Sequence, residues 1–251
     1  MKKIFLLSCS ILFFSCTHDD ASQIKKEKAI AQSVSGKYVN ETYVKDISDS
    51  VAGYAPFFAT QLNFISSDSV VMENGFESGL IAYKKNDDKN YTLIKASFRG
   101  DMKFSFNEDG SLTLINNYDN PKQLHQEKYI KLIDSTKNFP QFLNQYMITG
   151  EYQLTSNKKE KQIAVFNNDG KVTGIDDYTR YDICYSGDCL SEINERMNII
   201  YLYNNVRQDA FAFKGSKKMK QIDLYEITAS LIEDEKGNGV VGDKIYELKI
   251  K

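Results

Sequence analysis

The stretch MKFSFNEDGSLTLI (residues 102–115) decides the fold expected for this chain. Apolar and polar residues alternate on both sides of a central Asp-Gly pair. Side chains of a strand point to opposite faces in turn, so Met102, Phe104 and Phe106 would share one face. An Asp-Gly pair between alternating runs is a strong signal for a tight β-hairpin. The stretch FNNDGKVTGIDDYT (residues 166–179) repeats much of this pattern in the second half of the chain.

Short alternating segments of this kind continue from residue 35 to the end of the chain, separated by Asn, Asp and Gly residues. The composition agrees with strands, since the chain has 16 Tyr and 15 Phe against only 3 Pro. Many short strands joined by hairpins are typical of barrels and sandwiches. The expected fold class is therefore mainly β, with two small antiparallel barrel-like domains joined by a short helical linker.

Two segments carry apolar residues at helical spacing instead. Tyr43, Ile47, Val51, Tyr54 and Phe58 form a stripe that predicts a helix after the first strand, capped by Asn40. The stretch DSTKNFPQFLNQYMI (residues 134–148) predicts a short helix after Pro140. These two helices give the expected organisation, which is a first barrel over 35–134, a helical linker over 135–148 and a second barrel over 149–251.

The chain begins with a leader-like segment. Lys2 and Lys3 precede an apolar run over residues 4–14, which is too short to cross a hydrocarbon core. A positive start, a short apolar run and a small residue before the cut are the pattern of a signal peptide. We expect a leader over 1–15 and a polar tether over 16–34. The alternative is an ordinary signal peptide cut elsewhere, with Cys16 incidental.

The end of the leader, LFFSC (residues 12–16), resembles the lipobox of bacterial lipoproteins. With Asp19 and Asp20 close behind, it is similar to the surface lipoproteins of Bacteroidota. The resemblance implies that Cys16 carries acyl chains such as palmitate. It also implies an outer-membrane lipoprotein that faces the periplasm or the cell surface. Several acyl chains would hold the protein firmly at the membrane.

Both halves open with a further motif. Gly36-Lys37-Tyr38 and Gly150-Glu151-Tyr152 resemble the Gly-x-Trp start of lipocalin-like barrels, with Tyr in place of Trp. The helix expected after the first strand is also similar to the small lipocalin-like domains of Bacteroidota lipoproteins. The resemblance implies a lipocalin-like barrel in each half.

Cys184 and Cys189 lie close together in CYSGDC. In an exported protein such a pair predicts a disulfide that closes a turn. A zinc site is the alternative, but two thiolates without nearby histidines do not complete a tetrahedral shell. A redox pair lacks the Cys-x-x-Cys spacing. We therefore expect no metal and no cofactor.

The sequence lacks the residue patterns of common enzymes. His125 is the only histidine outside the tether, and we expect it in an exposed loop. The chain has no Gly-x-Ser-x-Gly elbow and no glycine-rich phosphate loop. Its formal net charge of −2 gives no electrostatic footprint for nucleic acid. We therefore expect no enzyme and no nucleic-acid partner, with an envelope enzyme as the weakest hypothesis.

Two functions remain open. The first is a binding module that holds a small or lipid-like ligand inside a hollow barrel, since eight strands enclose just enough space for one small ligand. The second is an interaction protein that meets an envelope partner, a host factor or an effector that it inhibits. The first predicts a lined cavity, and the second predicts filled barrels. Candidate ligand contacts, which core packing would also explain, are Tyr38, Tyr43, Tyr152 and Tyr181.

Overall fold

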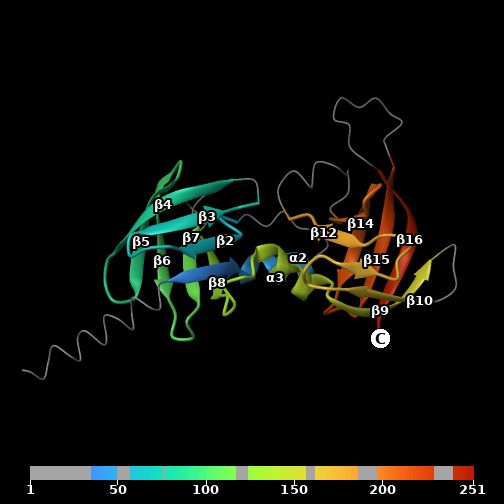
Figure 1. The fold of residues 1–251 in the computed structure, drawn as a ribbon. Helices are drawn as coiled ribbons and strands as arrows, with labels where there is room; N and C mark the ends of the chain where they lie inside the picture. Colours follow the sequence, from blue (N-terminus) through green and yellow to red (C-terminus); the bar gives the residue numbers. More distant parts are fainter. Residues whose placement is uncertain are drawn as a thin grey trace, which may run out of the picture. The chain divides into compact units, whose positions relative to one another are not determined.

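The alternating segments pair into two eight-stranded antiparallel sheets in a computed structural model of the chain (Figure 1). The two sheets confirm the mainly β fold with two barrel-like domains. The only helices in the described part of the chain are α2 (Glu41–Asp49) and α3 (Phe139–Met147), and neither is long and apolar enough to cross a membrane. The structure describes residues 35–49, 57–75, 77–116, 124–156, 162–185, 197–228 and 240–251.

The first sheet is a closed barrel in which each strand pairs with the next one along the chain, and the last pairs with the first. The hairpin quoted above is formed as predicted, with Met102 and Phe104 buried and Lys103 exposed. Its Gly110 has a φ of 77°, a conformation that suits glycine, and Gly110 N–H donates to Asn107 O over 3.1 Å. The strands are β1 (Gly36–Asn40), β2 (Gln61–Phe64), β3 (Ser69–Glu73), β4 (Ser78–Lys85), β5 (Asn90–Ser97), β6 (Gly100–Phe106), β7 (Leu112–Asn116) and β8 (His125–Lys131).

Aromatic rings fill the interior of this barrel. The rings of Tyr91 and Phe104 stack with centroids 5.1 Å apart, and Phe64 meets the ring of Tyr38 edge-on at 5.6 Å. Tyr83 is also buried, and its hydroxyl donates to Ser66 O over 2.8 Å. Eight strands leave an interior just wide enough for side chains to fill, and large rings occupy that space.

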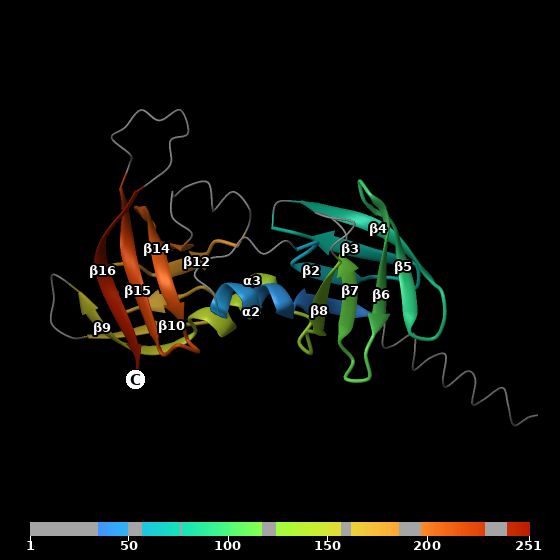
Figure 2. The same cartoon turned by 180° about the vertical axis from the view of Figure 1, so that it is seen from behind.

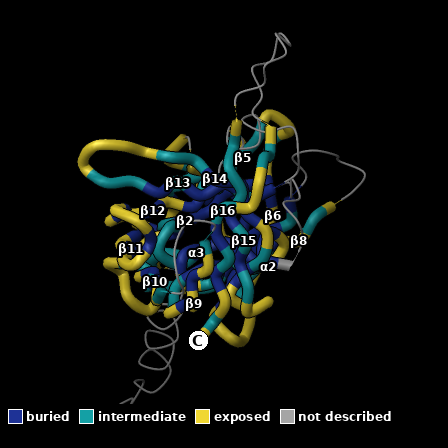
Figure 3. Tube along the Cα trace, turned by 90° about the vertical axis from the view of Figure 1, so that its right-hand side faces the viewer, coloured by how far each residue is buried: buried dark blue, intermediate teal, exposed yellow. Residues whose placement is uncertain are grey.

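The second sheet has the strand order β11-β10-β9-β16-β15-β14-β13-β12. Its two end strands approach each other, since Tyr181 N–H donates to Gly170 O over 2.7 Å and Lys171 forms a bridge with Arg180. Buried residues concentrate on the strands, whereas exposed ones concentrate at the turns (Figure 3). The strands are β9 (Gly150–Ser156), β10 (Gln162–Phe166), β11 (Val172–Thr173), β12 (Arg180–Ile183), β13 (Asn198–Tyr203), β14 (Gln208–Ser216), β15 (Gln221–Thr228) and β16 (Val240–Ile250).

Helix α2 begins directly after β1, and Asn40 caps it as predicted, because its Oδ1 accepts from Tyr43 N–H over 2.9 Å. The apolar stripe predicts a helix that reaches Phe58, whereas α2 ends at Asp49. Phe58 was expected on its apolar stripe but lies in an irregular segment before β2. There its N–H donates to the Glu127 carboxylate over 2.9 Å instead of to a helical carbonyl. Val51 and Tyr54 lie outside the described residues.

Helix α2 follows a strand of the first barrel but packs into the core of the second sheet. Val44 and Ile47 belong to the same buried cluster as Leu154, Ile200 and Leu224. The Asn198 side chain also donates to Ile47 O over 3.4 Å. Figure 2 shows α2 and α3 side by side, in agreement with their direct contacts. The core of the second sheet is therefore shared with residues of the first half.

Helix α3 forms the predicted linker helix. Asn138 and Gln141 make a capping box, in which each side chain accepts from the other's backbone N–H. Pro140 lies in the first turn, where a missing N–H costs nothing. Leu143 and Met147 are fully buried in the shared core.

Candidate functional site

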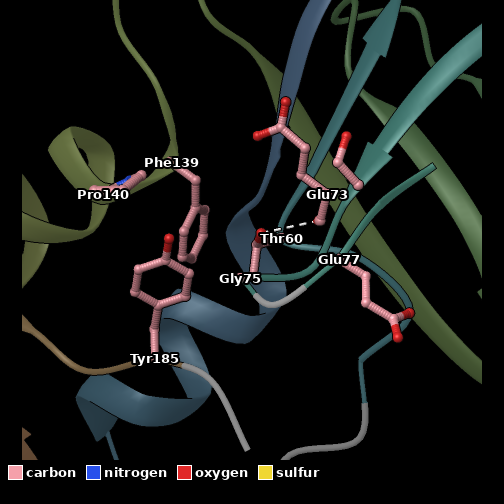
Figure 4. A pocket seen from close by; sticks show the side chains of 8 residues that line it. Thr60, Glu73, Gly75, Glu77, Phe139, Pro140 and Tyr185 are labelled. Carbon is pink, nitrogen blue, oxygen red and sulfur yellow. Dashed lines mark hydrogen bonds between the residues drawn. The ribbon is translucent and has the colours of Figure 1, made fainter. Parts of the chain in front are cut away.

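A cleft of about 280 Å³ lies where the β3–β4 turn of the first barrel meets the start of α3 (Figure 4). We call it the Tyr185 cleft. Rings form one side of it in Figure 4, and the turn with the residue before β2 forms the other. Its lining residues are Thr60, Glu73, Gly75, Glu77, Ser78, Phe139, Pro140 and Tyr185.

A tight turn places the acidic residues of the cleft. Asn74 and Glu77 close this turn with two hydrogen bonds, from Glu77 N–H to Asn74 Oδ1 over 2.8 Å and from Asn74 N–H to Glu77 O over 3.1 Å. Gly75 has a φ of 96°, which other residues rarely adopt. Glu73 ends β3, and its carbonyl accepts from both the N–H and the hydroxyl of Thr60, over 2.8 and 3.0 Å.

A short chain of hydrogen bonds ties the first turn of α3 to this acidic wall. Phe139 N–H, one of the donors that a helix start leaves unpaired, donates to Gln61 Oε1 over 3.2 Å. The amide nitrogen of Gln61 in turn donates to Glu73 Oε2 over 3.0 Å. The Glu73 carboxylate is therefore held in place beside the helix.

Tyr185 follows β12 and provides the aromatic wall. Its ring meets that of Phe139 edge-on, with centroids 5.0 Å apart. The hydroxyl of Tyr43 donates to Tyr185 O over 2.7 Å, which fixes the backbone at this point. Tyr43 also packs against Phe57, with ring centroids 4.4 Å apart. A residue of α2 thus supports the wall from behind without lining the cleft.

The cleft is acidic. Glu73 and Glu77 line it, and no basic side chain is among the residues described around it. Burial raises the pKa of the Tyr185 hydroxyl, and the charge of Glu73 raises it further, so this hydroxyl stays neutral at physiological pH. A lining that combines aromatic rings with two acidic residues favours a cation, because ring faces and negative charges both attract it.

The four tyrosines proposed from the sequence as ligand contacts do not line this cleft. Tyr38, Tyr152 and Tyr181 are fully buried, and Tyr43 is 8% exposed. The hydroxyl of Tyr181 donates to Asn167 O over 2.7 Å, whereas that of Tyr152 has no hydrogen-bond partner among the described residues. The packing of these rings favours the core role, and their role as ligand contacts stays a prediction.

The structure also places the histidine and one of the cysteines singled out from the sequence. His125 was expected in a loop but is the first residue of β8, paired with Asn116 of β7. Cys184 follows β12 and donates its N–H to Ile199 O over 2.9 Å. Cys189, Cys16 and the tether lie outside the described residues, so the disulfide and the lipid anchor stay predictions. Within the described ranges, no three His, Cys, Asp or Glu side chains are grouped to hold a metal ion.

The chain matches no protein-family model, no curated protein and no solved structure. The cleft must therefore be interpreted from its own residues. Sequence reasoning missed Glu73, Glu77 and Tyr185, which come from segments far apart in the chain. The sequence NGFE (residues 74–77) predicts a tight turn. It does not predict that α3 and Tyr185 pack against that turn.

Proposed function

We propose that the protein is a membrane-anchored interaction protein of the cell envelope and that it binds its partner through the Tyr185 cleft. The filled interior of the first barrel is the observation that favours this function over a hollow ligand carrier. Rings such as Tyr38, Phe64 and Tyr91 occupy the space that an enclosed ligand would need. Anchoring through Cys16 would place the cleft beside the membrane or at the cell surface.

The size and charge of the cleft indicate what it binds. About 280 Å³ is small compared with the roughly 300–1,000 Å³ of small-molecule pockets. A single side chain of a protein partner suits this space better than a lipid does. Because Glu73 and Glu77 make the lining acidic, we propose a lysine or arginine side chain, held against the ring of Tyr185. The partner is then a protein with a basic surface.

A titration with small probes tests the cationic specificity. Nα-acetyl-lysinamide, added to the full-length protein in detergent, should shift the NMR signals of Thr60, Ser78 and Tyr185, whereas uncharged Nα-acetyl-norleucinamide should not. Glu73→Gln and Glu77→Gln should each weaken lysine binding a few-fold, since exposed ion pairs contribute about 0.2–1 kcal/mol. Glu108→Gln, at an exposed turn, is the matched control.

Photo-crosslinking in cells tests the protein partner. A benzoylphenylalanine at position 78 should crosslink to one envelope protein, at or beside a lysine or arginine. The Glu73→Gln/Glu77→Gln double variant should abolish that crosslink. A crosslink of unchanged yield in the double variant contradicts the proposal. So does a small molecule that native mass spectrometry finds bound to the protein and released on denaturation.

A further inference from the structure

A second hollow lies on the outer face of the first barrel, away from the Tyr185 cleft. This outer groove has a volume of about 600 Å³ and runs across β4, β5, β6 and β7. Its lining residues are Lys84, Asn86, Asp87, Asn90, Tyr91, Thr92, Asp101, Lys103, Phe104, Ser105 and Ile115.

The strand register places two lysines on either side of a small residue. Lys84 pairs with Thr92, and Thr92 pairs with Lys103. Directly paired residues of an antiparallel sheet lie on the same face, with Cβ atoms about 4.5–5.5 Å apart. The two long lysine side chains therefore flank the short Thr92 from neighbouring strands, and both are exposed. Thr92 itself is 7% exposed, at the bottom of the groove.

A β-bulge lies at one side of the groove. The pairing of β5 with β6 shifts between Leu93 and Ser97, and Lys95 in this interval has a φ of 50°. The N–H of Lys95 donates to Asp101 Oδ1 over 2.8 Å. Bulges bend a strand and redirect its side chains, and they are frequent beside functional sites. Asp101, which accepts from the bulge, is one of the residues that line the groove.

The acidic residues of the groove are already bound to the backbone. Asp101 accepts from the bulge, as described, and Asp87 Oδ1 accepts from the N–H groups of Lys89 and Asn90, each over 3.0 Å. Hydrogen bonds from the Asn90 side chain, together with these two backbone bonds, lower the pKa of Asp87. Its carboxylate therefore stays ionised.

The lysines of the groove differ from their neighbours. Lys85 pairs with Asp88 and Lys89 with Glu108, both over 3.3 Å. The side chains of Lys84 and Lys103 have no ion pair and no hydrogen bond within the described ranges of the chain. Two lysines thus flank the Thr92 hydroxyl, which accepts from the Asn86 amide over 2.8 Å and keeps its own proton to donate.

We propose that the outer groove is a binding site for an acidic saccharide. Its carboxylate or sulfate group would lie between Lys84 and Lys103, above the hydroxyl of Thr92. The amide nitrogens of Asn86 and Asn90 already donate to Thr92 and Asp87, so their amide oxygens, with the hydroxyl of Ser105, would bind sugar hydroxyls along the rest of the groove. This site is separate from the Tyr185 cleft and does not depend on the function proposed for that cleft.

Calorimetry on the full-length protein in detergent tests the proposal with three probes, namely trigalacturonic acid, neutral maltotriose and inorganic phosphate. We expect trigalacturonic acid to bind at least about tenfold more tightly than the other two. Lys84→Gln/Lys103→Gln should weaken that binding by about tenfold or more, as expected for two lost charge contacts. Lys85→Gln/Lys89→Gln, at the end of β4 and in the β4–β5 turn, removes the same number of charges and should leave the affinity unchanged.

Three results would overturn the proposal. The first is that no probe binds, and the second is that both double variants weaken binding equally. The third is that phosphate binds as tightly as trigalacturonic acid, which would assign the site to free oxyanions instead of a saccharide. Thermal unfolding of each variant verifies that a loss of binding does not reflect a loss of fold.

Discussion

Glu127 is the only carboxyl group buried among the described residues, at 3% exposure inside the first barrel. Its Oε1 accepts from Phe58 N–H over 2.9 Å and from the Asn116 side chain over 2.5 Å. Its Oε2 lies 2.9 Å from the Asn40 amide nitrogen and 2.6 Å from the Tyr129 hydroxyl. Burial raises the pKa of Glu127, although these hydrogen bonds oppose the rise.

A neutral carboxyl group is compatible with every hydrogen bond of this network, in which the Asn40 amide also donates to Ala59 O over 3.0 Å. The Tyr129 hydroxyl also lies 2.9 Å from Ala59 O, but it has only one proton to donate. If Glu127 is protonated, its own proton bonds to the Tyr129 oxygen, and Tyr129 donates to Ala59. All members of the network are then satisfied, which explains why a carboxyl group is tolerated at this depth.

Two substitutions at Glu127 test this network. Glu127→Gln keeps the donor to Tyr129 and the acceptor for Phe58 and Asn116, and loses only the bond from Asn40. It should lower the free energy of unfolding by about 1–2 kcal/mol. Glu127→Leu leaves three buried donors unpaired and should cost about 3–5 kcal/mol. Urea unfolding measures both values, and equal costs for the two variants contradict the network.

The same group gives stability a defined dependence on pH. Because the pKa of Glu127 is raised in the folded state, the folded chain binds more protons than the unfolded chain above the ordinary value of 4.5. The contribution of Glu127 to stability is fully present below pH 4.5 and is lost as the pH rises through the pKa of the folded state. The stability of the wild type relative to Glu127→Gln should therefore fall from pH 4.5 upward in urea unfolding. A constant difference contradicts the raised pKa.

Helix α2 shows how an element of one barrel supports the other. It follows β1, yet Val44 and Ile47 lie in the core of the second sheet. The spacing of its apolar residues predicted a helix with a buried face. That spacing carries no information on which surface covers the face, so the sequence assigned α2 to the first barrel alone. Val39 of β1 is fully buried for the same reason, although it points out of its barrel.

Ile47→Ala tests this arrangement. Removing a buried isoleucine side chain should cost about 2–5 kcal/mol. The loss should appear in the second sheet, so hydrogen exchange should accelerate in β13 and β14 as well as in α2. Lys45→Ala, on the exposed face of the same helix, should change stability by no more than about 0.5 kcal/mol. Unchanged exchange in β13 and β14 would show that α2 does not support the second sheet.

At the scale of the whole molecule, residues Ser35–Lys251 form one compact unit. We therefore expect residues 149–251, expressed alone, to lack a cooperative unfolding transition, because α2 and α3 would no longer close their core. Residues 35–251 should unfold in one transition, measured by circular dichroism during heating. A fragment 149–251 that unfolds cooperatively at the same temperature would contradict a shared core.

Much of the fold follows from local patterns, and little of the candidate site does. Alternation such as that of Met102 to Phe106 predicts strands because burial on one face requires it. The Tyr185 cleft combines a turn, a helix start and a residue that follows β12, and only tertiary pairing brings these together. Alternation also does not distinguish a filled barrel from a hollow one. Inward-facing residues such as Tyr38 follow the same sequence pattern in both.

The position of α2 also has a mechanical consequence. A chain anchored at Cys16 would receive any pulling force first at β1, the strand that leads directly into α2. When β1 detaches from β2 and β8, α2 is withdrawn from the core that it shares with the second sheet. Under tension from the membrane, both halves of the molecule would then yield in a single step.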